Sequence, residues 1–228
     1  MKYDRIMTAE FVRRINRFTA EIKIDGTPEI CHVKNTGRLG ELLVPGARAF
    51  VQQSDKEDRK TKYSLVGVVK DGRVVNTDSQ APNKVFYEWV KKGGFVDGVT
   101  LIKPEKTFGD SRFDCYIEAQ ERKIFVEVKG VTLEKDGIAL FPDAPTERGV
   151  KHLRGLCECV RQGFEAYIVF VVQMKGVRGF APNKETHREF AKSLLECSTC
   201  GVNILCLDCD VTENTLEISE EIPVDLQR

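Results

Sequence analysis

The segment from Arg112 to Lys129 constrains the fold most, because burial of its apolar residues allows only one hairpin pairing. With Gln120 and Glu121 as a two-residue turn, Ala119 pairs with Arg122. One face of the hairpin then carries an unbroken apolar set: Phe113, Cys115 and Ile117 opposite Val128, Val126 and Ile124. A shift of the register by one residue would scatter this set over both faces, so the sequence predicts this pairing.

The same pairing brings two carboxylates together. Asp114 faces Glu127 across the strands, and Lys129 lies two residues beyond Glu127 on the same face. Two carboxylates with a lysine are typical of sites that cleave phosphodiesters with Mg²⁺ or Mn²⁺, hard cations that prefer oxygen ligands. We predict Asp114, Glu127 and Lys129 as catalytic residues, and Asp114, Glu127 and the carbonyl of Val128 as metal ligands, with no organic cofactor. Alternatively, the three side chains form a salt-bridged face of a surface hairpin.

The charge balance restricts how the chain could bind nucleic acid. It has 35 Lys+Arg against 35 Asp+Glu, so a nucleic-acid site must be a local basic patch. The hydrophobic fraction of 41% is enough for buried cores. No window approaches about 18 consecutive apolar residues, and the first residues carry charges, so we expect a cytoplasmic protein that does not bind membranes.

Short strands fill the region from residue 11 to about residue 77. The candidates are 18–24, 30–33, 47–51, 63–69 and 74–75, and Asp71-Gly72 fits a two-residue hairpin turn. About five strands in this length predict an OB-like β-barrel, a fold that binds oligonucleotides or oligosaccharides. We expect the loop 35–46 to form a short helix that closes the barrel. The charged run 54–62 is either a phosphate-contacting loop or a solvated one.

From residue 78 onward, helices and strands alternate. We predict helices at 79–92, 145–162 and 184–198, three strands within 110–141, and further strands at 166–173 and 202–208. The β-branched and aromatic residues of Tyr167–Val172 indicate a central buried strand. The chain is therefore predicted to be α/β, or α+β overall, with one domain at 1–77 and a second at 78–228.

Eight cysteines include two C-x-x-C pairs, Cys197/Cys200 and Cys206/Cys209, with five residues between them. A zinc ribbon usually separates its pairs by about 15–20 residues. We therefore favour small buried thiols over a disulfide, and a disulfide over a metal site.

Two resemblances rest on these motifs. The hairpin within a helix, three strands, helix, strand order resembles the PD-(D/E)XK nuclease superfamily, with Phe113 where that signature has proline. Four longer segments, spread over essentially the whole chain, resemble the sugar fermentation stimulation protein A family: 35–46 (NTGRLGELLVPG), 76–84 (NTDSQAPNK), 125–132 (FVEVKGVT) and 141–149 (FPDAPTERG). This resemblance implies an N-terminal OB-like barrel, a restriction-endonuclease-like αβββαβ domain, DNA binding without marked sequence preference and a regulatory role in sugar (maltose) metabolism.

Further residues are candidates for contacting nucleic acid or completing the site. The basic candidates are Arg13, Arg14, Arg17 and Arg38 in the barrel, and Arg148, Lys151 and His152 at the start of the helix after the hairpin. The accessory candidates are Asn83, Glu88 and Gln173. Each also has a structural interpretation, since the helix residues could form an exposed face, His152 could be a surface or capping histidine, and Gln173 could end a strand without a role.

These observations predict a DNA-binding protein, with RNA as a second partner to test, that carries a nuclease-like metal site. One alternative is a Mg²⁺-dependent DNA or RNA phosphodiesterase as the main role. Another, from a different class, is a small-ligand sensor that uses the barrel.

Overall fold

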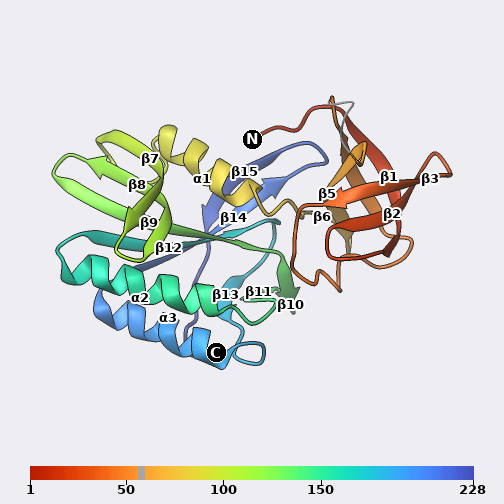
Figure 1. Ribbon diagram of the computed structural model, residues 1–228. Helices are drawn as coiled ribbons and strands as arrows, with labels where there is room; N and C mark the ends of the chain where they lie inside the picture. The colour runs from red at the N-terminus through yellow and green to blue at the C-terminus, as the bar shows by residue number, and fades with distance from the viewer. Residues whose placement is uncertain (56–59) are drawn as a thin grey trace.

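The structure is a computed structural model that describes residues 1–55 and 60–228. Figure 1 shows two parts, a barrel formed by the first third of the chain and a larger domain of sheet and helices. The central residues of the charged run predicted at 54–62 lie outside the described residues. In the described part of the chain, no helix is long and apolar enough to cross a membrane.

The barrel confirms the predicted OB-like fold. Its strands are β1 (Ile6–Arg14), β2 (Thr19–Ile24), β3 (Thr27–Val33), β4 (Arg48–Gln53), β5 (Tyr63–Lys70) and β6 (Arg73–Asn76). They are ordered β3-β2-β1-β4-β5-β6, and β3 also pairs with β5, which closes β1 to β5 into a barrel. Strand β6 extends the sheet through the predicted hairpin, whose turn residues Asp71 and Gly72 both have positive φ.

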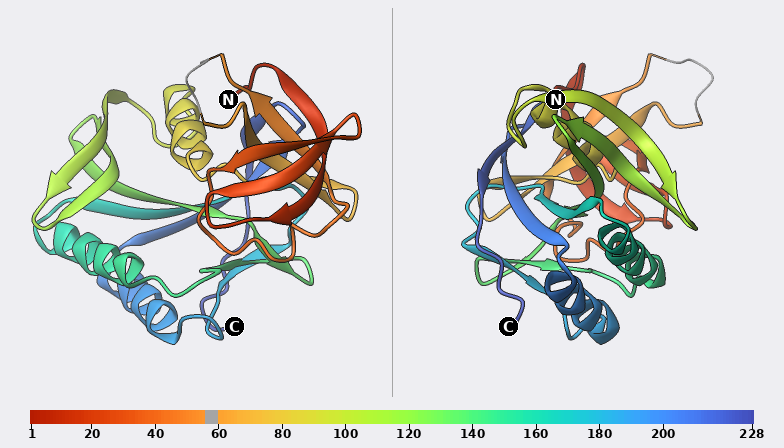
Figure 2. Two further views of the ribbon diagram at one scale, coloured as in Figure 1. Left: turned by 45° about the vertical axis from the view of Figure 1, so that its right-hand side comes forward. Right: turned by 90° about the vertical axis from the view of Figure 1, so that its left-hand side faces the viewer.

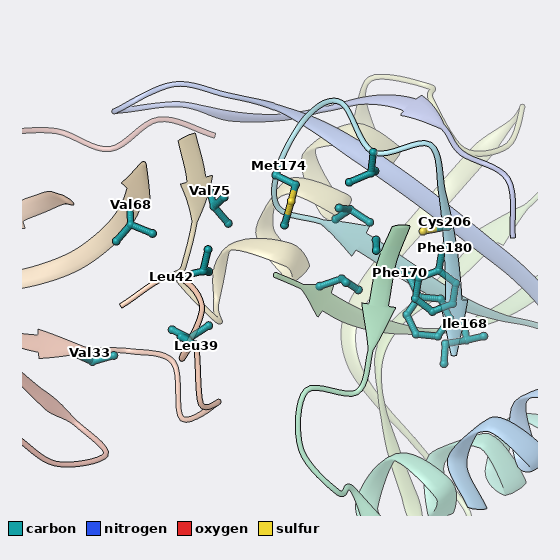
Figure 3. Close-up of a cluster of buried hydrophobic side chains, with 14 of the residues drawn as sticks. Val33, Leu39, Leu42, Val68, Val75, Ile168, Phe170, Met174, Phe180 and Cys206 are labelled. Carbon is teal, nitrogen blue, oxygen red and sulfur yellow. The ribbon is translucent and has the colours of Figure 1, made fainter. Parts of the chain in front are cut away.

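Two expectations about the barrel were wrong. Strand β1 was missed because a bulge between Phe11 and Arg13 breaks its two-residue alternation. The loop 35–46 forms a turn around Leu39, which has a φ of 49°, and no helix. Leu39 and Leu42 still close the barrel, because both side chains are buried among the core residues that Figure 3 shows beside Val33, Val68 and Val75. Arg38 is exposed, as expected.

The second domain is built on a six-stranded sheet ordered β15-β14-β12-β9-β8-β7. Its strands are β7 (Val99–Phe108), β8 (Ser111–Ala119), β9 (Arg122–Val131), β12 (Glu165–Val172), β14 (Asn203–Val211) and β15 (Leu216–Glu221), and its helices are α1 (Ala81–Lys91), α2 (Glu147–Arg161) and α3 (Arg188–Cys200). Helix α1 packs on one face, while α2 and α3 lie side by side on the other (Figure 2). Strand β12 is the predicted central strand, parallel to both β9 and β14.

The αβββαβ order is confirmed as α1, β7, β8, β9, α2 and β12, but the first of its three strands was placed wrongly. Strand β7 precedes the region 110–141, and the remaining part of that region forms β10 (Leu133–Lys135) and β11 (Ile138–Phe141), which join β13 (Gly179–Pro182) in a separate small sheet. Strand β7 was missed because it is an edge strand that is mostly exposed and contains Pro104, so its sequence lacks the two-residue alternation of a half-buried strand.

The cysteines are free thiols, and seven of the eight are buried. The closest pair, Cys157 of α2 and Cys197 of α3, has its sulfur atoms 3.2 Å apart where the two helices pack. The predicted preference for buried thiols is confirmed.

Candidate active site

The β8–β9 hairpin has the predicted register. Its paired residues run from Cys115 with Val126 to Ala119 with Arg122, and the turn residue Gln120 has a φ of 55°. Five apolar residues of one face pack in the core beneath α1: Cys115, Ile117, Ile124, Val126 and Val128. Burial of this face therefore selects the register, as argued from the sequence.

The hairpin ladder ends at Asp114, and this end forms the site. Here a carboxylate oxygen, Oδ2 of Asp114, accepts a hydrogen bond from the backbone N–H of Val128 at 2.9 Å, in place of a backbone carbonyl. The other oxygen, Oδ1, accepts a hydrogen bond from Nδ2 of Asn83 on α1, also at 2.9 Å. Glu105, which is opposite Asp114 in the β7–β8 register, has a φ of 55° in the left-handed region. Left-handed residues inside strands are strained and often occur at functional sites.

Phe113 lies on an unexpected face of the sheet. The alternation predicted Phe113 beside Cys115, whereas the structure packs it on the α2 side, against Phe125 and His152. The prediction for Phe113 was wrong because the alternation that holds from Cys115 to Ile117 does not extend back to Phe113, which joins the other core cluster.

Glu127 is the most constrained carboxylate of the site. Its side chain is almost completely buried, with 1% of the residue exposed. Oε1 accepts hydrogen bonds from Nζ of Lys129, at 2.5 Å, and from Nδ1 of His152. Oε2 is buried and has no hydrogen-bond partner among the described residues. An anionic oxygen without a partner is costly in a buried position, so we expect a water or a cation to contact this atom.

His152 is buried and holds Glu127 from α2. The residue is 6% exposed, its Nδ1 faces Glu127, and its Nε2 accepts Nε of Arg148 at 3.3 Å. Since an arginine nitrogen can only donate, this contact leaves the ring proton on Nδ1, aimed at Glu127. The expectation of a surface or capping histidine was wrong. Its signal was present in the chain, because Arg148 and His152 are four residues apart and share one helix face.

The two carboxylates have pKa values displaced in opposite directions. Burial raises the pKa of Asp114, and the negative charge of Glu127 raises it further. The backbone N–H of Val128, the charge of Lys129 and the side chain of Asn83 lower this pKa, but they do not outweigh the first two effects. Burial also acts to raise the pKa of Glu127, but the hydrogen bond from His152 and the charge and hydrogen bond of Lys129 together outweigh it and lower the pKa. Such divergence between neighbouring acids is a common property of catalytic sites.

The donor set suits a hard divalent cation. Within the described residues, no three histidine, cysteine or acidic side chains gather closely enough to hold a metal by themselves. Asp114 and Oε2 of Glu127 supply two anionic groups. The N–H of Val128 points to Asp114 on β8, and the carbonyl of the same residue points to that side of β9 as well. Two carboxylates, one carbonyl and several waters form the kind of incomplete shell that Mg²⁺ accepts.

The other predicted residues are placed as follows. Arg148 and Lys151 are exposed on α2, near His152. Gln173 is buried at the end of β12, where Nε2 donates to Asn76 and to the carbonyl of Asp78, so it joins the barrel to the second domain. Glu88 is not brought to the site, because its carboxylate pairs with the amino group of Met1 beside β15.

The barrel arginines divide into two groups. Arg13, Arg17 and Arg38 are exposed, although Arg13 pairs with Glu21. Arg14 instead donates all five of its N–H groups to backbone carbonyls: Nε to Asn16, Nη1 to Gly37 and Arg38, and Nη2 to Arg17 and Asn35. Arg14 therefore fixes two barrel loops against each other and has no N–H left for a phosphate.

A cleft of about 530 Å³ separates the barrel from the second domain next to this site. Arg17, Asn35 and Gly37 line its barrel wall, and Arg148 and Gly130 belong to the opposite wall. The walls touch where the N–H of Arg38 donates to Oδ2 of Asp143, at 3.2 Å. The sequence did not reveal this cleft, because its walls come from segments more than 100 residues apart.

Phe18 was also misjudged. The alternation placed it in a half-buried strand, whereas it precedes β2 and is 51% exposed, with the guanidinium of Arg17 over its ring at 5.8 Å. Arg17 and Phe18 thus form an adjacent exposed pair of a cation and an aromatic ring.

Comparison with known proteins gives concordant matches over both parts. The family model described as the sugar fermentation stimulation protein RE domain matches residues 80–215, and the one described as the SfsA N-terminal OB domain matches residues 12–77. A sugar fermentation stimulation protein homolog of Desulfitobacterium hafniense is 58% identical, with 99% of each chain covered. One from Clostridium beijerinckii is 54% identical, covering 98% of this chain and 99% of its own. The solved structure of Pyrococcus furiosus SfsA in complex with Ca²⁺ is similar with a TM-score of 0.90 and 31% identity, over 99% of this chain and 98% of that one.

Proposed function

Because the chain belongs to the sugar fermentation stimulation protein family, we propose that it is a nucleic-acid-binding protein that hydrolyses phosphodiester bonds with a divalent cation. The observation that carries this proposal is the state of Glu127, whose Oε1 is held by Lys129 and His152 while Oε2 is buried without a partner. A bound cation would neutralise that oxygen and the nearby Asp114 together.

Asp114, Oε2 of Glu127 and the carbonyl of Val128 would hold the cation, Mg²⁺ or Mn²⁺. The Pyrococcus furiosus relative was solved in complex with Ca²⁺, which, like Mg²⁺, takes oxygen ligands. When bound, such a cation polarises a phosphoryl oxygen and lowers the pKa of its water.

The surrounding side chains supply orientation and charge. Lys129 bonds Glu127 and is partly exposed, so its ammonium group can reach a phosphate or the attacking water. Asn83 holds Asp114 from α1, and His152 holds Glu127 from α2. Both carboxylates are therefore positioned before substrate arrives, which lowers the cost of reaching the reactive geometry.

The barrel supplies binding. OB folds frequently bind oligonucleotides, and Arg13, Arg17 and Arg38 are exposed on this one. Arginine contacts to phosphates position a nucleic acid but carry no base information, which supports DNA or RNA binding without marked sequence preference. The names of the relatives support a regulatory link to sugar metabolism.

A paired cleavage and binding assay tests the proposal. End-labelled single- and double-stranded DNA, and RNA, are incubated with wild type and Glu127→Ala in Mg²⁺, Mn²⁺ or EDTA, and binding is measured in parallel. Glu121→Ala, which removes an exposed acid from the turn of the same hairpin, is the matched control. We expect cleavage by wild type and the control, and none in EDTA or with Glu127→Ala. Binding by all three proteins without cleavage under any cation would instead identify a binding protein on a nuclease-like fold.

A further inference from the structure

The cleft beside the candidate site is separated from a second cavity by Ser79, which lines both. The second cavity has a volume of about 560 Å³ and is lined by Asn83, Asp114 and Val128, whereas the first is lined by Gly130. The two cavities therefore flank Val128–Gly130, the segment of β9 that contains Lys129.

From this arrangement we infer that the substrate is a single strand of nucleic acid, which runs from the barrel through the cleft, over Ser79 and into the second cavity. This inference rests on the proposed function, because it places the scissile phosphate at Asp114 and Lys129. It adds the substrate class and the path, with nucleotides on both sides of the reacting phosphate.

The size and closure of the cleft favour one strand over two. Each cavity falls within the range of sites for small ligands, roughly 300–1,000 Å³. The barrel loop and the loop that carries Asp143 meet through the Arg38 contact, so the cleft is bridged by protein on one side. A duplex would have to separate these loops, whereas a single strand can follow the existing space.

The floor of the path is rigid. A Cβ atom on Gly130 would lie 2.6 Å from Oε1 of Gln173 and 2.6 Å from Cγ of Pro82, so β9 is enclosed between these two residues. Gln173 is itself fixed by three hydrogen bonds to Asn76 and Asp78. A glycine is required at this close approach, and the backbone next to Lys129 keeps its position relative to the barrel.

The entrance of the path has the chemistry of single-strand binding. Arg17 lines the cleft from the barrel and lies over the exposed ring of Phe18, and exposed Arg148 lines the opposite wall. Proteins that bind single strands combine cationic grooves with exposed aromatic rings on which bases stack. Stacking needs unpaired bases, so Phe18 can contribute to a single strand but not to an intact duplex.

The test measures binding in EDTA, where the proposed hydrolysis cannot occur. Fluorescence anisotropy compares a labelled single-stranded oligonucleotide, its blunt duplex, and the duplex with a single-stranded overhang, each as DNA and as RNA. The proteins are wild type, Phe18→Ala, Ser79→Trp and the control Leu101→Ala, which truncates an exposed apolar residue of β7 on the other domain. Phe18 and Ser79 are both exposed, so neither change disturbs a core.

We expect single strands and overhangs to bind wild type at least roughly tenfold more tightly than the blunt duplex. Phe18→Ala should weaken single-strand binding roughly tenfold, since stacking on one aromatic ring contributes that order of affinity. Ser79→Trp should also weaken it, while Leu101→Ala matches wild type. Equal affinity for the blunt duplex, or equal binding by Phe18→Ala and Leu101→Ala, would overturn the inference. Because no cation is present, this result is independent of whether the protein cleaves.

Discussion

His152 Nδ1 donates a hydrogen bond to Oε1 of Glu127, although His152 lies on α2 and Glu127 on β9. Together with Lys129, this contact occupies one carboxylate oxygen and leaves Oε2 without a partner among the described residues, as the oxygen that would face the proposed cation. The orientation of the proposed metal ligand is therefore set by a helix that carries no ligand itself.

Replacing His152 by asparagine should weaken metal binding and cleavage together. Loss of a residue that orients a metal ligand typically costs about 10–100-fold in affinity or activity. Calorimetric titration with Mn²⁺ and the cation dependence of cleavage measure the two effects, with His32→Asn in the barrel as control. If the cation requirement of His152→Asn equals that of wild type, His152 does not position Glu127.

Replacing Asp114 by asparagine should abolish cleavage without destabilising the protein in EDTA. The pKa of Asp114 is raised in the folded protein, so ionisation of this carboxyl is less favourable there than in the unfolded chain. Its contribution to stability therefore falls as the pH rises from the unfolded pKa through the folded pKa. At about pH 7 the asparagine removes this repulsion from Glu127, and we expect urea unfolding to show an unchanged or higher free energy, by up to about 1 kcal/mol. A loss above about 2 kcal/mol would mean that Asp114 is chiefly a structural acceptor for Val128 and Asn83.

Arg14→Lys should destabilise the barrel while leaving the salt dependence of nucleic-acid binding unchanged. Lysine has three donors where Arg14 uses five, so we expect a loss of about 2–3 kcal/mol in unfolding free energy. Arg13→Lys, on the neighbouring exposed position, serves as control and should have little effect on stability. A change of about one in the slope of log K against log salt for Arg14→Lys would show that Arg14 contacts a phosphate after all.

The contact between Glu134 and Arg73 should make the domain junction sensitive to acid. Burial acts to raise the pKa of Glu134, but the N–H of Gly137 and the side chains of Arg73 and Lys70 together lower it from its ordinary 4.5. The stabilisation is thus present above about pH 4.5 and is lost as the pH falls through the lowered value. Glu134→Gln should cost about 1–2 kcal/mol near neutral pH and progressively less in acid. A difference from wild type that does not shrink in acid would contradict this assignment.

The thiols should react very unequally. Seven of the eight cysteines are buried, and Cys200 is partly exposed. Burial raises the pKa of Cys200 to about 11 and that of Cys31, Cys115 and Cys159 to about 12, which suppresses the reactive thiolate. Ellman's reagent should therefore modify at most about one thiol, Cys200, in the native protein, more slowly than a free thiol, and all eight in denaturant. Rapid modification of several native thiols would show that the packed cores that enclose them open readily.

Much of the site could be predicted from the sequence because strand pairing follows from burial. The alternation around Cys115 and Val126 allowed one register, and that register brought Asp114, Glu127 and Lys129 to the end of one hairpin. Asn83 was an accessory candidate, and its contact with Asp114 was found. The Asp71-Gly72 turn was predicted equally well, because positive φ at both positions is a local preference.

The sequence by itself determined the elements whose cause is local: alternation within a strand, periodicity within a helix, and turns with positive φ. Tertiary structure alone decided where these rules are interrupted or combined. Packing placed Phe113 on the α2 side of the sheet, and packing of α2 buried His152 against Glu127. The five carbonyls around Arg14 converge from two loops, and the cleft exists only where the barrel meets the second domain. Contacts between distant segments depend on how whole elements pack, and no local pattern records that packing.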